Sequence, residues 1–187
     1  GSRRDHPRAG ARHRLGAHEC CDTIGAGRVR IARGVYIGPT GLPSTGMAER
    51  ILVVDDHLFV GSAFRDLLGN QDDFLVVGAV EGAQEAIDWV RRDPPEVVLM
   101  DLRMPGMDGI EAARHIRAID PAVNCICLTA ADDPLLVRAF FQAGGRGYLT
   151  KACKPSEVFR AIREVMAGHE YVELALGQRM SIDQLHR

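Results

Sequence analysis

Short apolar runs recur along the chain and alternate with amphipathic stretches of helical period. The runs cover residues 51–54, 74–77, 97–100, 123–128 and 147–150. Between them apolar side chains recur at i, i+3, i+4 and i+7, as they do over residues 60–68, which predicts helices. Strands without polar alternation are typical of a parallel sheet that is buried on both faces. The pattern therefore predicts an α/β fold: a doubly wound, five-stranded parallel sheet with five flanking helices.

Residues 1–46 do not share this pattern. They hold nine of the 20 glycines and eight arginines against three acidic residues, and they show no sustained helical or strand period. We expect a disordered Arg/Gly-rich leader or an extension from a cloning vector, because Gly1-Ser2 resembles a cloning remnant and Met47 a natural start. A basic arm for nucleic acid and an Arg-rich transit peptide are the alternatives. The scattered arginines define no single amphipathic face for either.

Charge and cysteine usage narrow the function classes for the rest of the chain. Beyond residue 46 there are 22 acidic and 15 basic residues, a balance that disfavours a nucleic-acid surface on this part. No apolar run approaches the ~20 residues of a membrane span, so we expect no membrane contact. Five cysteines are an odd number, and Cys125 and Cys127 alternate within a strand-like run, which favours core packing. A reducing, cytoplasmic location follows.

Polar residues directly follow four of the apolar runs. Asp55 and Asp56 follow the first, Asp101 the third, Thr129 the fourth and Lys151 the fifth. Because parallel strands deliver their carboxyl ends to one edge of a sheet, we expect these five side chains to meet there. Any one aspartate could be a helix cap. Three carboxylates together repel one another unless a hard cation is bound, and Mg²⁺ suits such ligands.

The residue types at this edge fit phosphoryl acceptance. A carboxylate such as Asp101 can attack phosphorus and form an aspartyl phosphate. Lys151 supplies the opposing charge, and the Thr129 hydroxyl can donate a hydrogen bond to a phosphoryl oxygen. The chain has no Gly-x-x-x-x-Gly-Lys nucleotide loop, and Asp101-Leu102-Arg103 lacks the Asp-x-Asp of one phosphatase class. A turnover enzyme would need a substrate pocket for which no residues remain, so we expect a switch and not an enzyme.

The motifs at these positions resemble those of a known family. Asp55-Asp56-His57, Met100-Asp101-Leu102-Arg103-Met104-Pro105-Gly106, Leu128-Thr129-Ala130 and Gly147-Tyr148-Leu149-Thr150-Lys151 are similar to the receiver domain of bacterial two-component response regulators. The resemblance covers about residues 49–168 and implies a CheY-like, flavodoxin-like fold. Within that family the chain resembles the LuxR/FixJ-type (NarL-like) subfamily, and the global activators of the GacA/UvrY type in particular.

The resemblance implies a role for each matching position. Asp101 would be phosphorylated by a sensor histidine kinase. Mg²⁺ would be held by Asp56, Asp101 and the backbone carbonyl of Arg103, with Asp55 acting through water. Thr129 and Tyr148 would form the switch pair, in which the hydroxyl moves toward the phosphoryl group and the ring turns inward. The resemblance also implies a homodimer on phosphorylation.

Three residues have competing readings. Lys154-Pro155 mimics the Lys-Pro pair of other receivers, but Lys151 directly follows the fifth strand and is the better candidate to bind phosphate. Tyr148, without the family, is a strand aromatic for which a core or interface role is as good as a switch. His57 opens the first helix, and we expect it to be solvated.

The domain organisation follows from these readings. We expect a leader over residues 1–46, a receiver over residues 47–169 and a linker helix over residues 170–187. The linker would lead to a C-terminal DNA-binding output domain absent from this chain, through which alone the protein would contact DNA and regulate transcription. The alternative is a stand-alone receiver that acts as a phosphorelay intermediate or an adaptor. Coding sequence beyond Arg187 would separate the two.

Overall fold

The chain divides into two compact units, residues 1–45 and 46–187. The computed structural model describes residues 23–24, 28–32, 35–37, 43–44, 48–130 and 133–177. The first unit contributes a four-stranded antiparallel sheet in the order β1-β2-β3-β4. These strands are β1 (Thr23–Ile24), β2 (Arg28–Ala32), β3 (Val35–Ile37) and β4 (Pro43–Ser44). The expectation that residues 1–46 are a mostly disordered leader or extension stays a prediction, and most of these residues lie outside the described ones.

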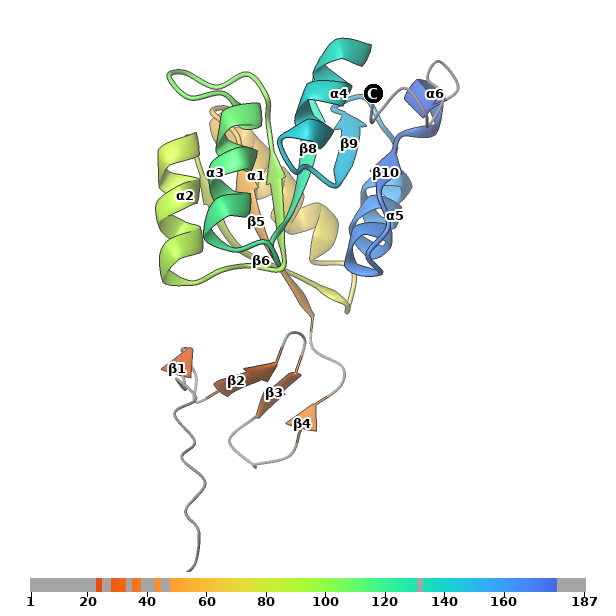
Figure 1. Ribbon diagram of the computed structural model, residues 1–187. Coiled ribbons are helices and arrows are strands. Elements are labelled where there is room, and N and C mark those ends of the chain that lie inside the picture. The colour runs from red at the N-terminus through yellow and green to blue at the C-terminus, as the bar shows by residue number, and fades with distance from the viewer. Residues whose placement is uncertain are drawn as a thin grey trace, which may run out of the picture. The chain divides into compact units, whose positions relative to one another are not determined.

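The second unit is built on a parallel sheet of six strands in the order β10-β9-β8-β7-β5-β6 (Figure 1). The strands are β5 (Glu49–Val54), β6 (Phe74–Val80), β7 (Val97–Met100), β8 (Asn124–Thr129), β9 (Gly147–Thr150) and β10 (Tyr171–Val172). The first five confirm the predicted α/β sheet. The sixth, β10, pairs in parallel with β9 at the sheet edge, in a segment that we had assigned to a linker.

Helices cover both faces of this sheet. They are α1 (Leu58–Leu68), α2 (Ala83–Arg92), α3 (Gly109–Ile119), α4 (Pro134–Gln142) and α5 (Pro155–Met166), with a short α6 (Leu174–Gly177) after β10. One core cluster joins the sheet to α2, α3 and α4, and a second joins the opposite face to α1 and α5. None of the described helices is long and apolar enough to cross a membrane.

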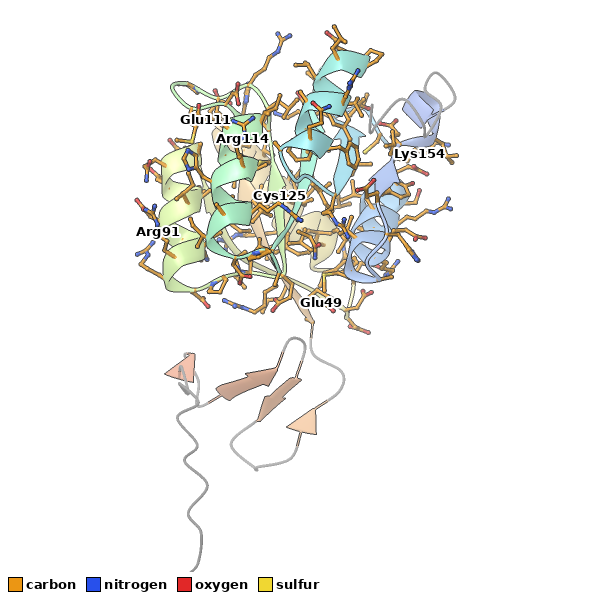
Figure 2. The ribbon with its side chains drawn as sticks, viewed as in Figure 1. Glu49, Arg91, Glu111, Arg114, Cys125 and Lys154 are labelled. Carbon is orange, nitrogen blue, oxygen red and sulfur yellow. The ribbon has the colours of Figure 1, made fainter. Side chains whose placement is uncertain are left out.

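The strands supply both clusters because their side chains alternate between the two faces. In β7, Val98 and Met100 belong to the cluster under α2, α3 and α4, whereas Val97 and Leu99 belong to the one under α1 and α5. A strand whose two faces both pack against buried side chains has no face toward solvent. Its sequence is therefore apolar without interruption. Cys125 and Cys127 are both buried in the first cluster, as their spacing predicts. Figure 2 shows Cys125 inside the molecule.

Two helices begin at aspartate caps. The Asp108 carboxylate accepts a hydrogen bond from the Glu111 N–H at 2.8 Å, and the Asp133 carboxylate accepts one from the Leu135 N–H at 2.9 Å. Each satisfies an N–H that the first helical turn leaves unpaired. Pro134 follows at the first helical position, where its missing N–H costs nothing. These caps therefore define the first residues of α3 and α4.

Candidate functional site

The acidic residues at the carboxyl edge are held by the backbone ladder of the sheet. The Asp101 N–H donates to the Val54 carbonyl at 2.9 Å, and the Asp55 N–H donates to the Val80 carbonyl at 3.0 Å. Each aspartate therefore continues the pairing of its strand by one residue, and the backbones of β5 and β7 fix the two carboxylates side by side. Their side chains are nearly buried, with 3% of Asp55 and 6% of Asp101 exposed.

Lys151 joins these two carboxylates. Its Nζ lies 2.6 Å from Asp55 Oδ2 and 2.6 Å from Asp101 Oδ2, and its backbone N–H donates to the Thr129 carbonyl at 2.8 Å. Burial by itself lowers the pKa of Lys151, but the hydrogen bonds to Asp101 and Asp55 outweigh burial and raise that pKa above its ordinary value. The ammonium is therefore a fixed positive charge beside Asp101.

The expected competitor of Lys151 is elsewhere. Lys154 is exposed at the N-cap of α5, and Figure 2 shows it on the outside of the molecule. Lys151 is thus the lysine that the fold brings to the acidic residues, as its position directly after β9 predicts.

Asp56 completes an acidic cluster with donor atoms suited to a cation. Asp55, Asp56, His57 and Asp101 each offer one ligand atom, and these atoms lie within 4.8 Å of one another. Asp56 Oδ1 is buried and accepts no hydrogen bond. Its contact is an ion pair with His57 Nδ1 at 3.0 Å, and a bound cation would compensate the charge of this buried oxygen as well. The cluster therefore fits a divalent ion of the kind that receivers bind.

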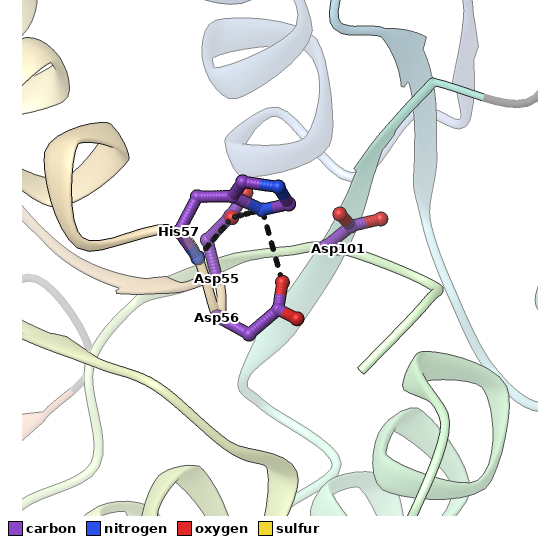
Figure 3. Close-up of side chains that lie close together, drawn as sticks. All are labelled: Asp55, Asp56, His57 and Asp101. Atoms are coloured by element: carbon purple, nitrogen blue, oxygen red, sulfur yellow. Dashed lines mark hydrogen bonds and ion pairs between the residues drawn. The ribbon is translucent and has the colours of Figure 1, made fainter. Parts of the chain in front are cut away.

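His57 has a position that the sequence did not reveal. Its side chain is 69% exposed, in line with the expectation that it is solvated, yet Nδ1 lies 3.0 Å from Asp55 Oδ1 and 3.0 Å from Asp56 Oδ1. Figure 3 shows the imidazole reaching both carboxylates. The His57 N–H also donates to Asp55 Oδ1 at 3.0 Å. No signal in the sequence distinguishes a histidine that turns toward the two preceding aspartates from one that turns away.

Arg103 contacts the site through its backbone. Its N–H donates to Asp101 Oδ1 at 3.1 Å, so the two oxygens of Asp101 are held by different donors, Oδ1 by this amide and Oδ2 by Lys151. The expected role of the Arg103 carbonyl as a metal ligand stays a prediction. A hollow of about 520 Å³ opens beside Asp56 and Arg103 and gives solvent access to the Asp56 side of the cluster.

Thr129 and Tyr148, the expected switch pair, are both fully buried. The Tyr148 ring lies edge-on to Phe140, with 6.2 Å between ring centroids, so it occupies the inward position. Its hydroxyl bonds to the Cys127 side chain on the paired strand. Burial is the main cause that raises the pKa of the Cys127 thiol well above its ordinary value, and the charge of Asp101 adds to it, while the Tyr148 hydrogen bond opposes it. Whether the pair switches stays a prediction.

Glu173 is a second residue that the sequence did not single out. It follows β10, and its carboxylate Oε2 accepts hydrogen bonds from both the N–H and the hydroxyl of Thr150, the residue before Lys151. The Glu173 N–H in turn donates to the Tyr148 carbonyl at 3.0 Å. The segment after α5 is therefore tied to the strand that delivers Lys151.

Comparison with known proteins identifies the family. The family model described as the response regulator receiver domain matches residues 51–163 of this chain. The chain belongs to the response regulator receiver family. This receiver is 38% identical over 135 residues to the response regulator UvrY of Escherichia coli strain K12, and 37% identical over 131 residues to the response regulator GacA of Pseudomonas protegens. The alignments cover 72% and 70% of this chain but 62% of each relative, so the receiver spans less than two thirds of their length.

Solved structures give the same result. A two-component response regulator of the LuxR family from Aurantimonas sp. SI85-9A1 superposes with a TM-score of 0.70 at 34% identity, over 74% of this chain and 99% of that one. The signal receiver domain of the response regulator NarL from Mycobacterium tuberculosis superposes with a TM-score of 0.62 at 29% identity, over 65% and 98%. The expected kinship with receivers, and with the GacA/UvrY type among them, is confirmed. As a receiver the chain is a phosphoacceptor switch of two-component signalling and not an enzyme.

Proposed function

We propose that Asp101 is the phosphoryl acceptor and that a sensor histidine kinase is the donor. The observation that carries this proposal is the pairing of Asp101 Oδ2 with Lys151 Nζ at 2.6 Å, beside an acidic cluster that opens to solvent. An almost buried carboxylate beside a fixed cation, next to a hollow that reaches the neighbouring Asp56, is placed for attack on a phosphoryl group brought by a partner.

Each residue of the site has a separate role in the proposed phosphoryl transfer. An oxygen of the Asp101 carboxylate bonds to phosphorus as the bond from phosphorus to the kinase histidine nitrogen breaks, and the released imidazole takes up a proton. Lys151 compensates the charge that the phosphoryl oxygens bring, and the Arg103 N–H holds the second Asp101 oxygen. The Thr129 hydroxyl donates to a phosphoryl oxygen, and Thr129 and Tyr148 form the switch pair, in which the Tyr148 ring points inward in the phosphorylated state.

The metal of this site is Mg²⁺ in our proposal. Asp56, Asp101 and the Arg103 carbonyl would hold it, with Asp55 acting through water. When bound, the ion neutralises negative charge on the phosphoryl oxygens and on the attacking carboxylate. Asp56 Oδ1 supports this assignment because it is buried and, apart from the contact with His57 Nδ1 at 3.0 Å, has no hydrogen-bond partner among the described residues.

The output lies outside this chain in our proposal. Residues 47–169 form the receiver, residues 170–187 lead to a DNA-binding domain, and residues 1–46 are a leader or a vector-derived extension. The support is that the chain covers only 62% of the regulators UvrY and GacA. Phosphorylation would favour a homodimer, which would bring two output domains to DNA in the cytoplasm. A stand-alone relay is the outcome if the coding sequence ends at Arg187.

The test is intact-mass analysis after incubation with a small phosphodonor and Mg²⁺. We expect the wild-type chain to gain one phosphoryl group, and Asp101→Asn to gain none. Asp72→Asn, which removes an exposed carboxylate from the loop before β6, is the matched control and should gain one group as the wild type does. A gain that survives in Asp101→Asn, or no gain in the wild type, overturns the assignment. Sedimentation with a phosphoryl mimic tests the dimer.

A further inference from the structure

The strand β6 (Phe74–Val80) forms one edge of the parallel sheet, and its outer side pairs with no other strand of the described residues. It contains no charged or polar side chain and no proline, the residues that usually keep edge strands from pairing with another chain. We propose that β6 pairs antiparallel with β6 of a second copy of this chain, about a two-fold axis beside Val77. The helix α2 of one copy then packs against α2 of the other.

A bulge in β6 places the axis. The register with β5 shifts after Val76, so that Val77 is the extra residue and has no Cα partner in β5. Val77 is also the middle residue of the strand. A bulge interrupts a pairing that runs past it. An axis at Val77 sets the two bulges opposite each other, so residues 74–76 of each copy pair with residues 78–80 of the other.

The apolar side chains at this edge fit the same register. Leu75 is large and apolar, yet it is 48% exposed, and Ala79 is exposed as well. Around an axis at Val77, Leu75 of each copy lies opposite Ala79 of the other. Pairing therefore removes both side chains from water, which favours association.

The helix α2 leaves room for a neighbour beside β6. A hollow of about 570 Å³ is lined by Val80 of β6 and by residues 85, 88, 89, 91 and 92 of α2. The Trp89 ring holds α2 over the strand, because it packs where a Cβ of Gly78 would lie. Figure 1 shows α2 at the opposite end of this unit from α5 and α6, and Figure 2 shows Arg91 pointing outward from it.

The charges of α2 complement each other about this axis. Glu85 is in the first turn and Arg92 in the last, on the side of the helix that lines the hollow. Midway between them, Trp89 packs on Gly78, the residue after Val77. Two copies of α2 therefore run antiparallel across the axis, and Glu85 of each meets Arg92 of the other.

Neither of these two charges is used within its own chain. Among the described residues, Glu85 and Arg92 form no ion pair, whereas Asp88 and Arg91 between them pair with each other at 3.0 Å. The Arg92 Nε donates to the Asp88 carbonyl at 3.1 Å, which keeps the side chain along the helix. The two charges that remain are the two that the axis brings together, and this selects a second copy as the occupant of the edge.

Sedimentation of the full, unphosphorylated chain tests the inference. No phosphodonor is present, so the dimer proposed for the phosphorylated state does not contribute. We expect a dimer with a dissociation constant in the micromolar range, because one strand pair and one helix pair form a small interface. Amide hydrogen exchange in β6 should slow as the dimer forms. A chain that stays monomeric at about 200 µM, or a dimer with unchanged exchange in β6, overturns the inference.

Charge reversal identifies the contact. Glu85→Arg and Arg92→Glu each place two like-charged pairs across the axis, so each should weaken the dimer at least about tenfold. The double variant has opposite charges again and should regain the wild-type affinity within about threefold. The two single variants should also associate when they are mixed, because each supplies the charge that the other lacks.

Glu164→Arg is the matched control. It reverses an exposed carboxylate on α5, a helix that packs on β8, β9 and β10 and not on β6. This variant should dimerise as the wild type does. A dimer that neither α2 variant weakens, or that the double variant and the mixture fail to restore, overturns the inference. The proposed function fails separately, by the absence of phosphoryl transfer to Asp101.

Discussion

Glu173 accepts two hydrogen bonds from Thr150 through one carboxylate oxygen, at 2.8 Å from the backbone nitrogen and 2.7 Å from the hydroxyl. Thr150 pairs across the sheet with Thr129 and directly precedes Lys151. One end of this relationship is therefore at the proposed phosphoacceptor site, and the other is in the segment that follows β10. We therefore expect a displacement of Thr129 or Lys151 to shift Glu173, and a displacement of Glu173 to shift Thr129 or Lys151.

Glu173→Ala should loosen this connection. Both bonds share one charged, partly buried acceptor oxygen, so we count them together as a single charged hydrogen bond of about 1.5–3 kcal/mol and expect the free energy of unfolding to fall by about 2 kcal/mol. Because Thr150 positions Lys151, we also expect slower phosphorylation by a small phosphodonor. Urea unfolding and the rate of mass gain measure the two effects.

Glu164→Ala is the control for this substitution. Glu164 lies on α5, and its carboxylate contacts exposed His169. We expect a change within about 0.5 kcal/mol and an unchanged rate. A stability loss in Glu173→Ala without any change in rate would mean that Glu173 holds the strand β10 but does not position Lys151.

In Lys151→Met the ammonium no longer compensates the repulsion between the Asp55 and Asp101 carboxylates, so the folded state should be less stable. Removing one partner of a buried ion pair typically costs about 3–5 kcal/mol, and Lys151 is 25% exposed, so we expect about 3 kcal/mol at pH 7. Mg²⁺ should restore part of this stability, because it binds the folded cluster and replaces the lost charge. Urea unfolding with and without Mg²⁺ measures both quantities.

A second substitution checks the cause of that loss. In the double variant Lys151→Met with Asp55→Asn, one of the two buried carboxylates is neutral, so most of the stability should return. Asp73→Asn breaks the exposed ion pair with Arg163 instead, and added to Lys151→Met it should restore nothing. An equally low stability in the double variant would show that Lys151→Met acts through packing.

The strands β5, β7, β8 and β9 could be predicted because most of their residues are buried on both faces, whereas the edge strand β6 is partly exposed and was marked by its apolar run. Val97–Met100 has four apolar residues in a row and all four are buried, so hydrophobicity alone marks it. The same logic places Asp55, Asp101, Thr129 and Lys151, because the residue after a parallel strand must emerge at the shared edge. For these residues, position in the chain determined position in space.

Other features depend on contacts that no local pattern encodes. The strand β10 has only two residues, Tyr171 and Val172, too few to show a period, and it exists because the edge of β9 offers unpaired backbone groups. The orientation of His57 depends on a single side-chain rotation toward Asp55 and Asp56. Both could be found only once the sheet had brought their partners into place.

Gly109→Ala should disturb the site through backbone contact. A Cβ at this position would lie 2.3 Å from the Asp101 carbonyl oxygen and 2.9 Å from the Leu102 Cα. Neither atom can move without moving the phosphoacceptor loop. We expect a loss of about 2 kcal/mol in urea unfolding and slower phosphorylation, although alanine has the higher intrinsic helix propensity.

Gly82→Ala is the matched control, since Gly82 precedes the first turn of α2 and nothing lies within 4 Å of an added Cβ. Its effect should stay below about 1 kcal/mol. If Gly109→Ala were as stable as the wild type or more so, the close approach of α3 to Asp101 would not limit the residue at this position.

Tyr171 should make stability fall with rising pH. Its hydroxyl donates to the Glu157 carboxylate, and burial, together with this acceptor, raises the pKa of Tyr171. In the unfolded chain a tyrosine titrates near pH 10. Above that pH the unfolded state releases a proton that the folded state keeps, so the free energy of unfolding falls by up to about 1.4 kcal/mol per pH unit.

Tyr171→Phe removes this dependence and keeps the ring. The wild type should therefore be the more stable protein below pH 10, and its advantage should shrink as the pH rises toward the folded-state pKa of Tyr171. Urea unfolding of both proteins between pH 8 and pH 11 measures the difference, and groups that both proteins share, such as Lys151, cancel from it. Parallel stability curves would contradict the prediction. They would mean that the hydrogen bond to Glu157 does not hold the phenol in its neutral form.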